Sequence, residues 1–290
     1  MANSITLFKK YIDLLDEVYK VASITSVLDS DASLARQGAN ANEIIIPKIS
    51  MDGLADYSRN SGYVSGDVSL TNETVKFNYD RGRKFSIDAM DNEETAGVAF
   101  GKLASEFVRT KVVPELDAFR FASYAGITGI SKATAATLSA GGDVISALRV
   151  AINKMDEDEV PMENRVLFIT PTLYGMIQDL DTTKSKEVIN RFSATKLVPQ
   201  TRFYTAIDLK DGTTEGEEAG GFAKATAGKD INFMVIHKPA TLQYNKHVVS
   251  KIFSPAENQD ADAWKFSYRA YGLTDAYENK VAGIYLHNKA

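Results

Sequence analysis

The sequence predicts an α+β fold, and three observations carry this prediction. The stretch from Asn92 to Ala125 is compatible with one helix far longer than the ~11–12 residues of an average helix. Residues 66–80 and 263–287 alternate apolar and polar side chains, which is typical of half-buried antiparallel strands. Residues 143–238 combine an amphipathic helix with short apolar runs of strand type. Together they indicate sheets and shorter helices arranged around one long helix.

Length and composition describe a folded protein without export or membrane signals. The 290 residues suffice for a sizeable core and for two subdomains. A net charge of −5 argues against nucleic-acid binding through a generally basic surface. The absence of cysteine excludes disulfides and thiolate metal sites and fits a reducing compartment, so we expect the cytoplasm. No apolar run approaches the ~20 residues that cross a bilayer, so no membrane contact is expected.

The first fifty residues indicate an extended arm. An amphipathic helix capped by Ser4 is predicted from apolar residues spaced three and four apart. These residues are Ile5, Phe8, Ile12, Leu15 and Tyr19. Residues 23–42 are polar and have no clear period, and EIIIPKIS that follows is a short β-branched strand interrupted by Pro47. No adjacent segment supplies a matching apolar face, so the helix needs another surface to cover it.

Residues 51–79 predict a long polar excursion made of hairpin strands. Val68 and Leu70 alternate with polar residues, as do Val75, Phe77 and Tyr79, and Thr71–Glu73 between them is placed to turn the chain. The apolar content is too small for an independent core, so the hairpin should project or lie on a partner. The segment RGRKFSIDAMD then returns the chain to the long helix.

The ends of the long helix are marked by local signals. Asp91 is placed to cap its first turn, with Glu94 reaching back as in a capping box. Gly126 is a suitable stop, since glycine adopts left-handed backbone without steric cost. At 1.5 Å per residue the helix would reach ~50 Å. Pro114 should bend it.

The second half of the chain predicts an α/β layer. A flexible connector, GITGISKATAATLSAGG, marks a subdomain boundary, and Asp143 opens an amphipathic helix. The predicted strands are RVLFIT, TRFYTAIDL and INFMVIHK, and PTLYGMIQDL is a helix with proline in its first turn. Residues 211–229 are glycine-rich and predict a mobile surface loop. A short helix and the strand TLQYNKHVVSKIF follow, and the C-terminal segment predicts two antiparallel strands.

No pattern in the sequence predicts an enzyme. Walker A, G-x-G-x-x-G and G-x-S-x-G motifs are absent, and His237, His247 and His287 lack metalloprotease spacing. The acidic runs 156–159 and 215–218 lack the glycine turn of an EF-hand and are interpreted as solvated surface. Aromatic residues at Trp264, Phe266, Tyr268 and Tyr271 can stack on bases, but their alternation favours core or interface. We therefore predict no catalytic residue, no cofactor and no metal site.

The order of these parts carries a family resemblance. It rests on five stretches: IPKISMDGLADYSRNSGY, DRGRKFSIDAMDNEETA, EFVRTKVVPELDAFRFASYA, VLFITPTLYGMI and SPAENQDADAWKFSYRAYG. In this order they resemble the major capsid proteins of tailed phages with the Hong Kong 97-type fold, in particular coat subunits of phages that infect Gram-positive hosts. None of the stretches is a catalytic motif. The specificity lies in their number and order.

The resemblance implies a division of the chain and a function. The implied parts are an N-terminal arm (1–50), an extended loop (51–79), a peripheral domain with the spine helix (80–142), an axial domain (143–238) and C-terminal strands completing the peripheral domain (239–290). The implied function is that of a structural coat protein. It would form hexamers and pentamers of an icosahedral phage head, assemble in the host cytoplasm and remain in the virion.

The resemblance also implies partners. These are other copies of the chain, a portal, a separate scaffolding protein, and double-stranded DNA that is enclosed without sequence-specific binding. A separate scaffolding protein is expected because there is no room for a scaffolding segment before the arm. Some members join subunits through lysine–asparagine bonds. Here the extended loop offers only Lys76, close to its base, so we expect no covalent links.

The predicted subunit-interface residues come from the arm and the extended loop. They are Phe8, Ile12, Leu15, Asp56, Tyr57, Arg59 and Tyr63. Two alternatives stay open: an encapsulin-like nanocompartment shell, which shares the fold and would enclose an enzyme cargo, and an ordinary soluble α/β enzyme.

Overall fold

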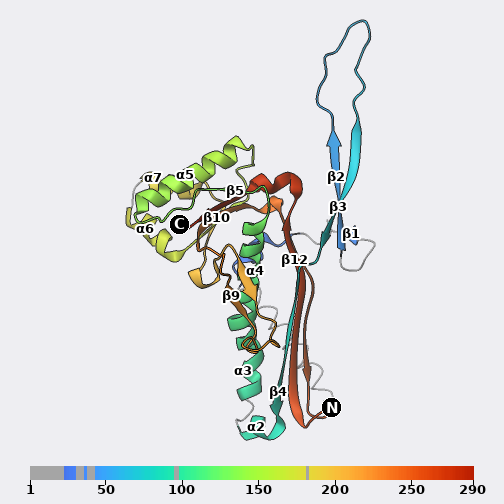
Figure 1. The fold of residues 1–290 in the computed structure, drawn as a ribbon, viewed down its shortest axis with the longest axis vertical. Coiled ribbons are helices and arrows are strands. Elements are labelled where there is room, and N and C mark those ends of the chain that lie inside the picture. The colour runs from blue at the N-terminus through green and yellow to red at the C-terminus, as the bar shows by residue number, and fades with distance from the viewer. Residues whose placement is uncertain (1–22, 31–35, 38–42, 95–97, 181–182) are drawn as a thin grey trace.

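The computed structural model of the chain describes residues 23–30, 36–37, 43–94, 98–180 and 183–290. The molecule is elongated (Figure 1): a long helical column runs beside a long sheet, a second sheet covered by helices lies at one end, and a hairpin projects beyond it. This arrangement confirms the predicted α+β class. The predicted arm helix with Phe8, Ile12 and Leu15 lies outside the described residues.

The long sheet contains three antiparallel strands in the order β11, β12, β4. Their bounds are Thr241–Phe253 for β11, Ala263–Ala276 for β12 and Tyr79–Asp88 for β4. Alternate side chains of a strand point to one face, and Phe266, Tyr268 and Ala270 of β12 are all buried. The predicted alternation in this segment is confirmed, and its apolar face is the one that the long helix covers.

Three α-helical segments and one wider turn lie along the predicted long helix, with residues 95–97 between the first two outside the described part of the chain. They are α2 (Ala89–Glu94), α3 (Val98–Phe107), a π-helical turn (Val108–Val112) and α4 (Val113–Gly126). We call Val98–Gly126 the spine helix. It ends at Gly126 as predicted, but α2 begins at Ala89, before the expected cap at Asp91. The Oδ1 atom of Asp88 accepts a hydrogen bond from Met90 N at 2.9 Å and so caps the earlier start.

The π-helical turn explains how the spine helix accommodates Pro114. Proline has no backbone N–H, and its ring clashes with the carbonyl four residues earlier. The wider turn comes directly before α4, and Pro114 lies in the first turn of that helix, where no N–H is needed. The distortion expected at Pro114 is therefore a local change of helical pitch.

The spine helix packs on the long sheet through one row of side chains. The residues of this row recur every four positions: Ala104, Val108, Val112 and Leu116. Phe107 beside them meets Phe85 of β4 edge to face, with ring centroids 4.8 Å apart and planes at 71°. Such pairs add to the stability gained from burial alone. One helix face and one sheet face thus form a continuous core.

The second sheet has five strands in the order β5, β13, β10, β6, β7. Their bounds are Ser131–Lys132, Ile284–Asn288, Ile231–His237, Arg165–Ile169 and Ala194–Leu197. Every residue of β10 and β6 is buried, as expected of central strands covered on both faces. The predicted strands RVLFIT and INFMVIHK are confirmed.

The two faces of this sheet contact different helices. Val166 and Phe168 of β6 pack with the end of α4, whereas Leu167 and Ile169 pack with α5 (Gly141–Glu157) and α6 (Pro171–Leu180). Helix α6 starts at Pro171 as predicted, whereas α5 starts at Gly141, two residues before the expected Asp143, whose Oδ2 atom accepts a hydrogen bond from Ala140 N. A third helix, α7 (Thr183–Asn190), was not predicted. The sheet therefore joins the spine helix to a helical layer.

Two strand predictions in the second half of the chain are wrong. Most of TRFYTAIDL is a 3₁₀ turn (Gln200–Arg202) and irregular chain, and only β8 (Ile207–Leu209) is a strand, paired with β9 (Phe222–Lys224). The two C-terminal strands do not pair with each other. The 3₁₀ segment Glu278–Gly283 after β12 carries the chain to the second sheet, where β13 pairs with β10.

The connector after Gly126 is more ordered than its composition suggested. Its strand β5 pairs in parallel with β13, and Ala133 N and Ala136 N donate hydrogen bonds to the carbonyls of Leu286 and Asn288. Backbone pairing to a sheet edge depends little on side-chain identity, so a small-residue composition does not reveal it.

The projecting hairpin is built from β2 (Glu43–Met51) and β3 (Val68–Lys76), with β1 (Arg36–Gln37) paired to its base. The expected turn at Thr71–Glu73 is wrong, because these residues lie inside β3, opposite residues 46–48. The strand EIIIPKIS, which we placed in the arm, supplies the partner for β3. The chain reverses instead within residues 52–67.

A buried carboxylate connects three distant segments. Asp117 of α4 is fully buried and accepts hydrogen bonds from Ser23 Oγ (2.9 Å), Thr25 Oγ1 (2.6 Å) and the backbone N of Ile24 and Thr25. Arg202 Nη1 donates to Asp117 Oδ2 at 3.1 Å, the oxygen that also accepts from Ile24 N. A buried charge is tolerated only when it is paired and hydrogen-bonded in this way. Asp117 thus fixes residues 23–25, which belong to the predicted N-terminal arm.

Arg120, one turn further along α4, extends the same network. Its Nη1 atom donates to Thr25 Oγ1 at 2.9 Å, and its Nη2 atom donates to Asn245 Oδ1 of β11 at 3.2 Å. The guanidinium is 1% exposed. The Thr25 hydroxyl therefore accepts from Arg120 and donates to Asp117, which sets its orientation.

Two buried histidines lie in the second sheet. His287 of β13 stacks on Phe233 with centroids 4.9 Å apart, and its Nδ1 atom lies 3.0 Å from Asn232 Nδ2. Burial lowers the pKa of His287. Burial also lowers the pKa of His237 at the end of β10, and the charges of Arg165 and Lys280 lower it further. Both rings are therefore neutral at neutral pH.

We predict that Asp117→Asn destabilises the folded chain by about 3–5 kcal/mol, because it leaves the partly buried Arg202 charge unpaired and replaces one of two fully buried oxygens that accept hydrogen bonds. Urea unfolding followed by circular dichroism measures this change. The matched control is Asp80→Asn, which breaks a surface pair with Arg269 (2.7 Å) and should leave stability close to that of the wild type. An equal, small effect of both variants would contradict this account.

We predict that acid destabilises the chain through its two buried histidines. In the unfolded chain histidine binds a proton near pH ~6.5, whereas the lowered pKa values in the folded chain oppose protonation. Their contribution is fully present above the unfolded pKa and is lost as pH falls towards the folded values. In His237→Gln/His287→Gln, the free energy of unfolding should change less between about pH 7.5 and about pH 5.5, as urea titrations measure. The same pH dependence in both proteins would refute this assignment.

Candidate functional site

The projecting hairpin carries most of the large apolar side chains left exposed. In the described part of the chain, eight of the fourteen such residues belong to it. They are Ile49, Met51, Leu54, Tyr57, Tyr63, Val64, Val68 and Leu70. Contiguous exposed apolar surface marks an interaction site.

Four of these side chains form a stripe on one face of the hairpin. Ile49 lies opposite Leu70, and Met51 lies opposite Val68, so the pairs share a face. Their exposed fractions lie between 61% and 73%. We call these four residues the apolar stripe. A two-stranded hairpin needs a covered apolar face to be stable, and the described residues supply no second layer at the stripe.

The tip of the hairpin, residues 52–67, is held by few internal contacts. Ser58 and Gly62 exchange backbone hydrogen bonds of 3.2 and 2.8 Å, and the left-handed backbone of Gly62 (φ 79°) closes the turn. The rings of Tyr57 and Tyr63 meet edge to face, 4.9 Å apart. Asp52 Oδ2 accepts a hydrogen bond from Asp67 N where the strands end. The tip is therefore shaped but not buried.

The base of the hairpin is fixed to the body. Ile44 and Val75 are buried in a cluster with Leu242 and Leu273 of the long sheet. On the surface, Lys48 Nζ pairs with Glu278 at 2.9 Å. Burial and the nearby Glu278 charge raise the pKa of Glu73. The base thus has an apolar anchor and a polar rim, and it aims the tip away from the body.

The interface residues predicted in the loop all lie at this tip. Asp56, Tyr57, Arg59 and Tyr63 are exposed and fall within eight positions of one another on both sides of the turn. Phe8, Ile12 and Leu15 lie outside the described residues, so their role stays a prediction. The apolar stripe was missed, because its partner strand had been placed in the arm.

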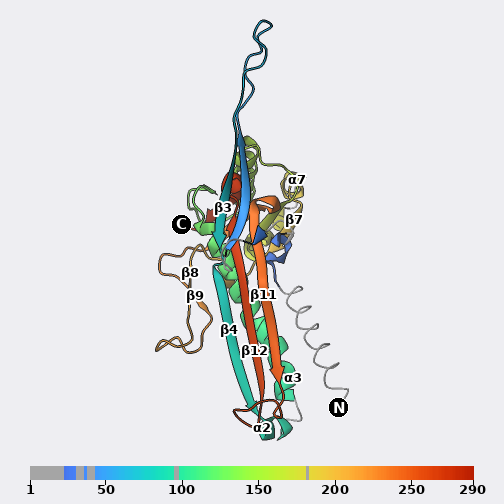
Figure 2. The same cartoon turned by 90° about the vertical axis from the view of Figure 1, so that its right-hand side faces the viewer.

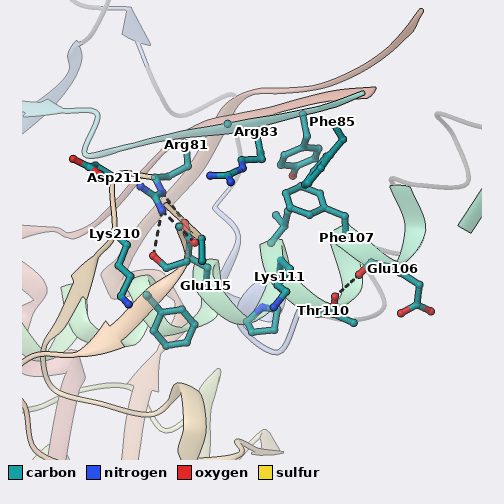
Figure 3. A pocket seen from close by; sticks show the side chains of 18 of the residues that line it. Arg81, Arg83, Phe85, Glu106, Phe107, Thr110, Lys111, Glu115, Lys210 and Asp211 are labelled. Atoms are coloured by element: carbon teal, nitrogen blue, oxygen red, sulfur yellow. Dashed lines mark hydrogen bonds and ion pairs between the residues drawn. The ribbon is translucent and has the colours of Figure 1, made fainter. Parts of the chain in front are cut away.

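A cavity of about 880 Å³ lies between the spine helix, strand β4 and residues 210–222 (Figure 3). Its wall is mostly apolar. The apolar and aromatic residues that line it are Tyr79, Phe85, Leu103, Phe107, Val112, Pro114, Phe222 and Tyr268. A largely apolar cavity of this size with a few polar groups is typical of a binding site.

Two arginines of β4 hold residues 211–221 over the cavity. Arg81 Nε pairs with Glu115 of the spine helix at 2.7 Å, and Arg81 Nη2 donates to the Gly221 carbonyl at 3.3 Å. Arg83 Nη2 donates to the Glu218 carbonyl at 2.8 Å. Gly212 has φ 78°, and a Cβ there would lie 2.7 Å from Arg83 Nη1. The segment expected to be a mobile loop is thus folded back onto the sheet.

Tyr79 and Asp211 add polar groups to the wall of the cavity. Burial, followed by the charge of Glu115, raises the pKa of Tyr79 well above its ordinary value, so its hydroxyl stays protonated and donates to Glu115 at 3.3 Å. Hydrogen bonds from Thr214 and Thr213 lower the pKa of Asp211. Asp211 therefore stays charged and keeps its turn closed.

Positive charge predominates among the unpaired groups around the cavity. Glu115 is neutralised by Arg81, and Glu106 pairs with Arg109 at 2.7 Å. Lys111 and Lys210 line the cavity, and neither forms an ion pair with a described residue. The cavity thus combines an aromatic floor with a cationic rim, a combination that no local sequence signal indicates because four distant segments create it.

The described residues give no indication of metal chemistry. No group of three or more histidine, aspartate or glutamate side chains among them is placed to hold a metal ion. No helix in the described ranges is both long and apolar enough to span a bilayer. The features of the described residues that suggest a binding function are the exposed hairpin and the apolar cavity.

Comparison with known proteins finds likeness at the level of structure. No family model and no curated protein sequence matches the chain. A chain of Gordonia phage Cozz is 13% identical with a TM-score of 0.61, covering 92% of this chain and 86% of that chain. A virus-like particle from Pyrococcus furiosus is 11% identical with a TM-score of 0.58, covering 96% and 98%. The capsid structure of Staphylococcus phage Andhra is 12% identical with a TM-score of 0.54, covering 90% and 84%.

Proposed function

Because the chain has the Hong Kong 97-type fold, we propose that it is a structural subunit that assembles with copies of itself into a closed shell. More specifically, we propose the coat protein of a tailed-phage head, which forms hexamers and pentamers around double-stranded DNA. Its partners would then include a scaffolding protein and a portal during assembly in the host cytoplasm. The proposal assigns the chain no enzymatic activity.

The observation that carries this proposal is the exposed hairpin. A side chain the size of those in the apolar stripe contributes ~1.5–3 kcal/mol when it is fully buried. A neighbouring subunit that covers the stripe would gain several such contributions, which offset the entropy lost on association. In a monomer the same residues only lower solubility. Exposure of this surface is therefore understandable in a protein that functions as an assembly.

The proposed parts of the subunit follow the resemblance, with one adjustment. We propose residues 1–50 as the arm, 51–79 as the extended loop, 80–142 as the peripheral domain, 143–238 as the axial domain and 239–290 as C-terminal strands. Strand β2, at the end of the arm, serves as one side of the hairpin. Phe8, Ile12 and Leu15 are proposed to bind a neighbour.

A second candidate is a shell that encloses protein instead of DNA. The virus-like particle from Pyrococcus furiosus supports it, since 96% of this chain and 98% of that chain are covered, so the lengths nearly agree. Both candidates use the same self-assembly and differ in their contents. The content of purified particles therefore decides between them.

We predict that the expressed chain, supplied with a scaffolding protein where needed, forms closed particles. Negative-stain electron microscopy and sedimentation measure this directly, and nuclease treatment followed by protein analysis identifies the contents. DNA-filled shells support the phage-head form and protein-filled shells the compartment form. A chain that stays monomeric under every scaffold condition would contradict both the phage-head form and the compartment form.

The variant that links assembly to the hairpin is Ile49→Ser/Leu70→Ser. Both side chains are exposed, so the isolated subunit should unfold at the same urea concentration as the wild type, while particle yield should be lost. The matched control is Val150→Ser/Met162→Ser, which removes two similarly exposed apolar residues elsewhere. Normal particles from the first variant would show that the stripe is not an assembly surface.

A further inference from the structure

We propose that the cavity between the spine helix, β4 and residues 210–222 binds a small aromatic carboxylate, a molecule with one negative charge on an aromatic ring system. The inference goes beyond the proposed shell function and does not depend on it, because all the residues that line the cavity belong to one chain. Three properties of these residues carry it: the enclosure of the cavity, its aromatic wall and the charge at its rim.

Three elements enclose the cavity. Strands β8 and β9 lie beside β4, at the edge of the long sheet opposite to β11 (Figure 2). The volume of about 880 Å³ falls within the ~300–1,000 Å³ of small-molecule sites. Hydrogen bonds from Arg81 to the Gly221 carbonyl and from Arg83 to the Glu218 carbonyl hold the third side in place. Because the wall is already fixed, little ordering entropy is lost when a ligand binds.

The wall of the cavity is suited to an aromatic ring. Five of the residues that line it are aromatic. Phe85, Leu103 and Phe107 are half-buried: they pack against the core between the spine helix and the long sheet, and they also line the cavity. Figure 3 shows Phe85 and Phe107 together on one side of the cavity and Lys210 on another. An aromatic ligand would meet the two phenylalanine rings in the edge-to-face or offset geometry that aromatic pairs prefer.

The charges around the cavity favour an anion. The carboxylates that line it are Glu106, Glu115 and Asp211, and each already has an arginine or a hydrogen-bond donor as its partner. Lys111 and Lys210 line the cavity without an ion-pair partner among the described residues. Two ammonium groups beside an apolar wall attract a carboxylate and repel a cation of the same shape.

These two groups of residues define how the ligand lies. Its ring is placed against Phe85 and Phe107, and its carboxylate is placed towards Lys111 and Lys210. The aromatic wall provides affinity for any ligand of suitable shape, whereas the lysines distinguish an anion from a neutral molecule. The proposed site therefore predicts a preference that depends on charge and is separable from the affinity for the ring.

Binding of three probes to the full-length, unassembled chain tests this preference. The probes share one ring system and differ in charge: naphthoate is an anion, naphthalenemethanol is neutral and naphthylmethylamine is a cation. Isothermal calorimetry and ligand-observed NMR measure the Kd. We expect naphthoate to bind at one site per chain about tenfold more tightly than the alcohol, which is the size expected of two partly exposed ion pairs. The amine should bind most weakly.

The lysine variant that tests the rim is Lys111→Ala/Lys210→Ala. It should bind naphthoate about tenfold more weakly and the alcohol as tightly as the wild type does. The matched control is Lys132→Ala/Lys251→Ala, which removes two exposed lysines that do not line the cavity. This control should bind both probes unchanged.

A second variant tests the location. Ala219 is an exposed residue of the cavity wall, so the indole ring of Ala219→Trp would occupy the space and should weaken the binding of naphthoate and the alcohol alike. Its matched control is Ser146→Trp at an exposed position of α5, which should bind both probes normally.

Three results would each overturn the inference: no saturable binding of naphthoate to the wild type, equal affinity of the wild type for naphthoate and the alcohol, or unchanged naphthoate binding in Ala219→Trp. Urea titration checks that each variant is folded. If a variant is not folded, the comparison of the three probes on the wild type still decides. Failure of any of these tests leaves the shell function intact, since that function is judged by particle formation.

Discussion

The buried carboxylate of Asp117 is the contact on which the arrangement of the molecule depends. It lies on the spine helix, and its hydrogen-bond donors come from residues 23–25 and from Arg202 in the segment before β8. A desolvated carboxylate costs several kcal/mol unless its partners are present. Its environment therefore favours one mutual arrangement of the three segments. Gln243 of β11 adds a fourth, since its Nε2 atom donates to the Thr25 carbonyl at 2.9 Å.

Stability is distributed unevenly along the molecule. In the body of the molecule, the spine helix and both sheets share apolar clusters in which many side chains are fully buried. The hairpin beyond its base has no such cluster, and its apolar stripe faces outward. The proposed assembly would supply the hairpin with the cover that the described residues do not, whereas the body has a core of its own.

The elements that the sequence predicts correctly are those with a strong local period. RVLFIT and INFMVIHK each contain an uninterrupted apolar run, 166–169 and 233–236, and Trp264, Phe266 and Tyr268 alternate with polar residues in β12. The failures concern partners far apart in sequence. Thr71–Glu73 has turn composition, yet pairing with β2 extends it as a strand, and β13 pairs with β10 rather than with the neighbouring β12. The predicted tip residues are exposed, as their lack of a local core suggested, and their role stays a prediction; the cavity is lined by separate segments between Tyr79 and Tyr268, which no local pattern connects.

The most direct test of this division is hydrogen–deuterium exchange on isolated subunits and on assembled particles of the same chain. Exchange reports how often each backbone amide opens to solvent. We expect amides of residues 52–67 to exchange rapidly in the subunit and to become protected in the particle, while amides of α4 around Asp117 are protected in both. Equally rapid exchange of the tip in both states would contradict the claim that neighbouring copies stabilise the hairpin.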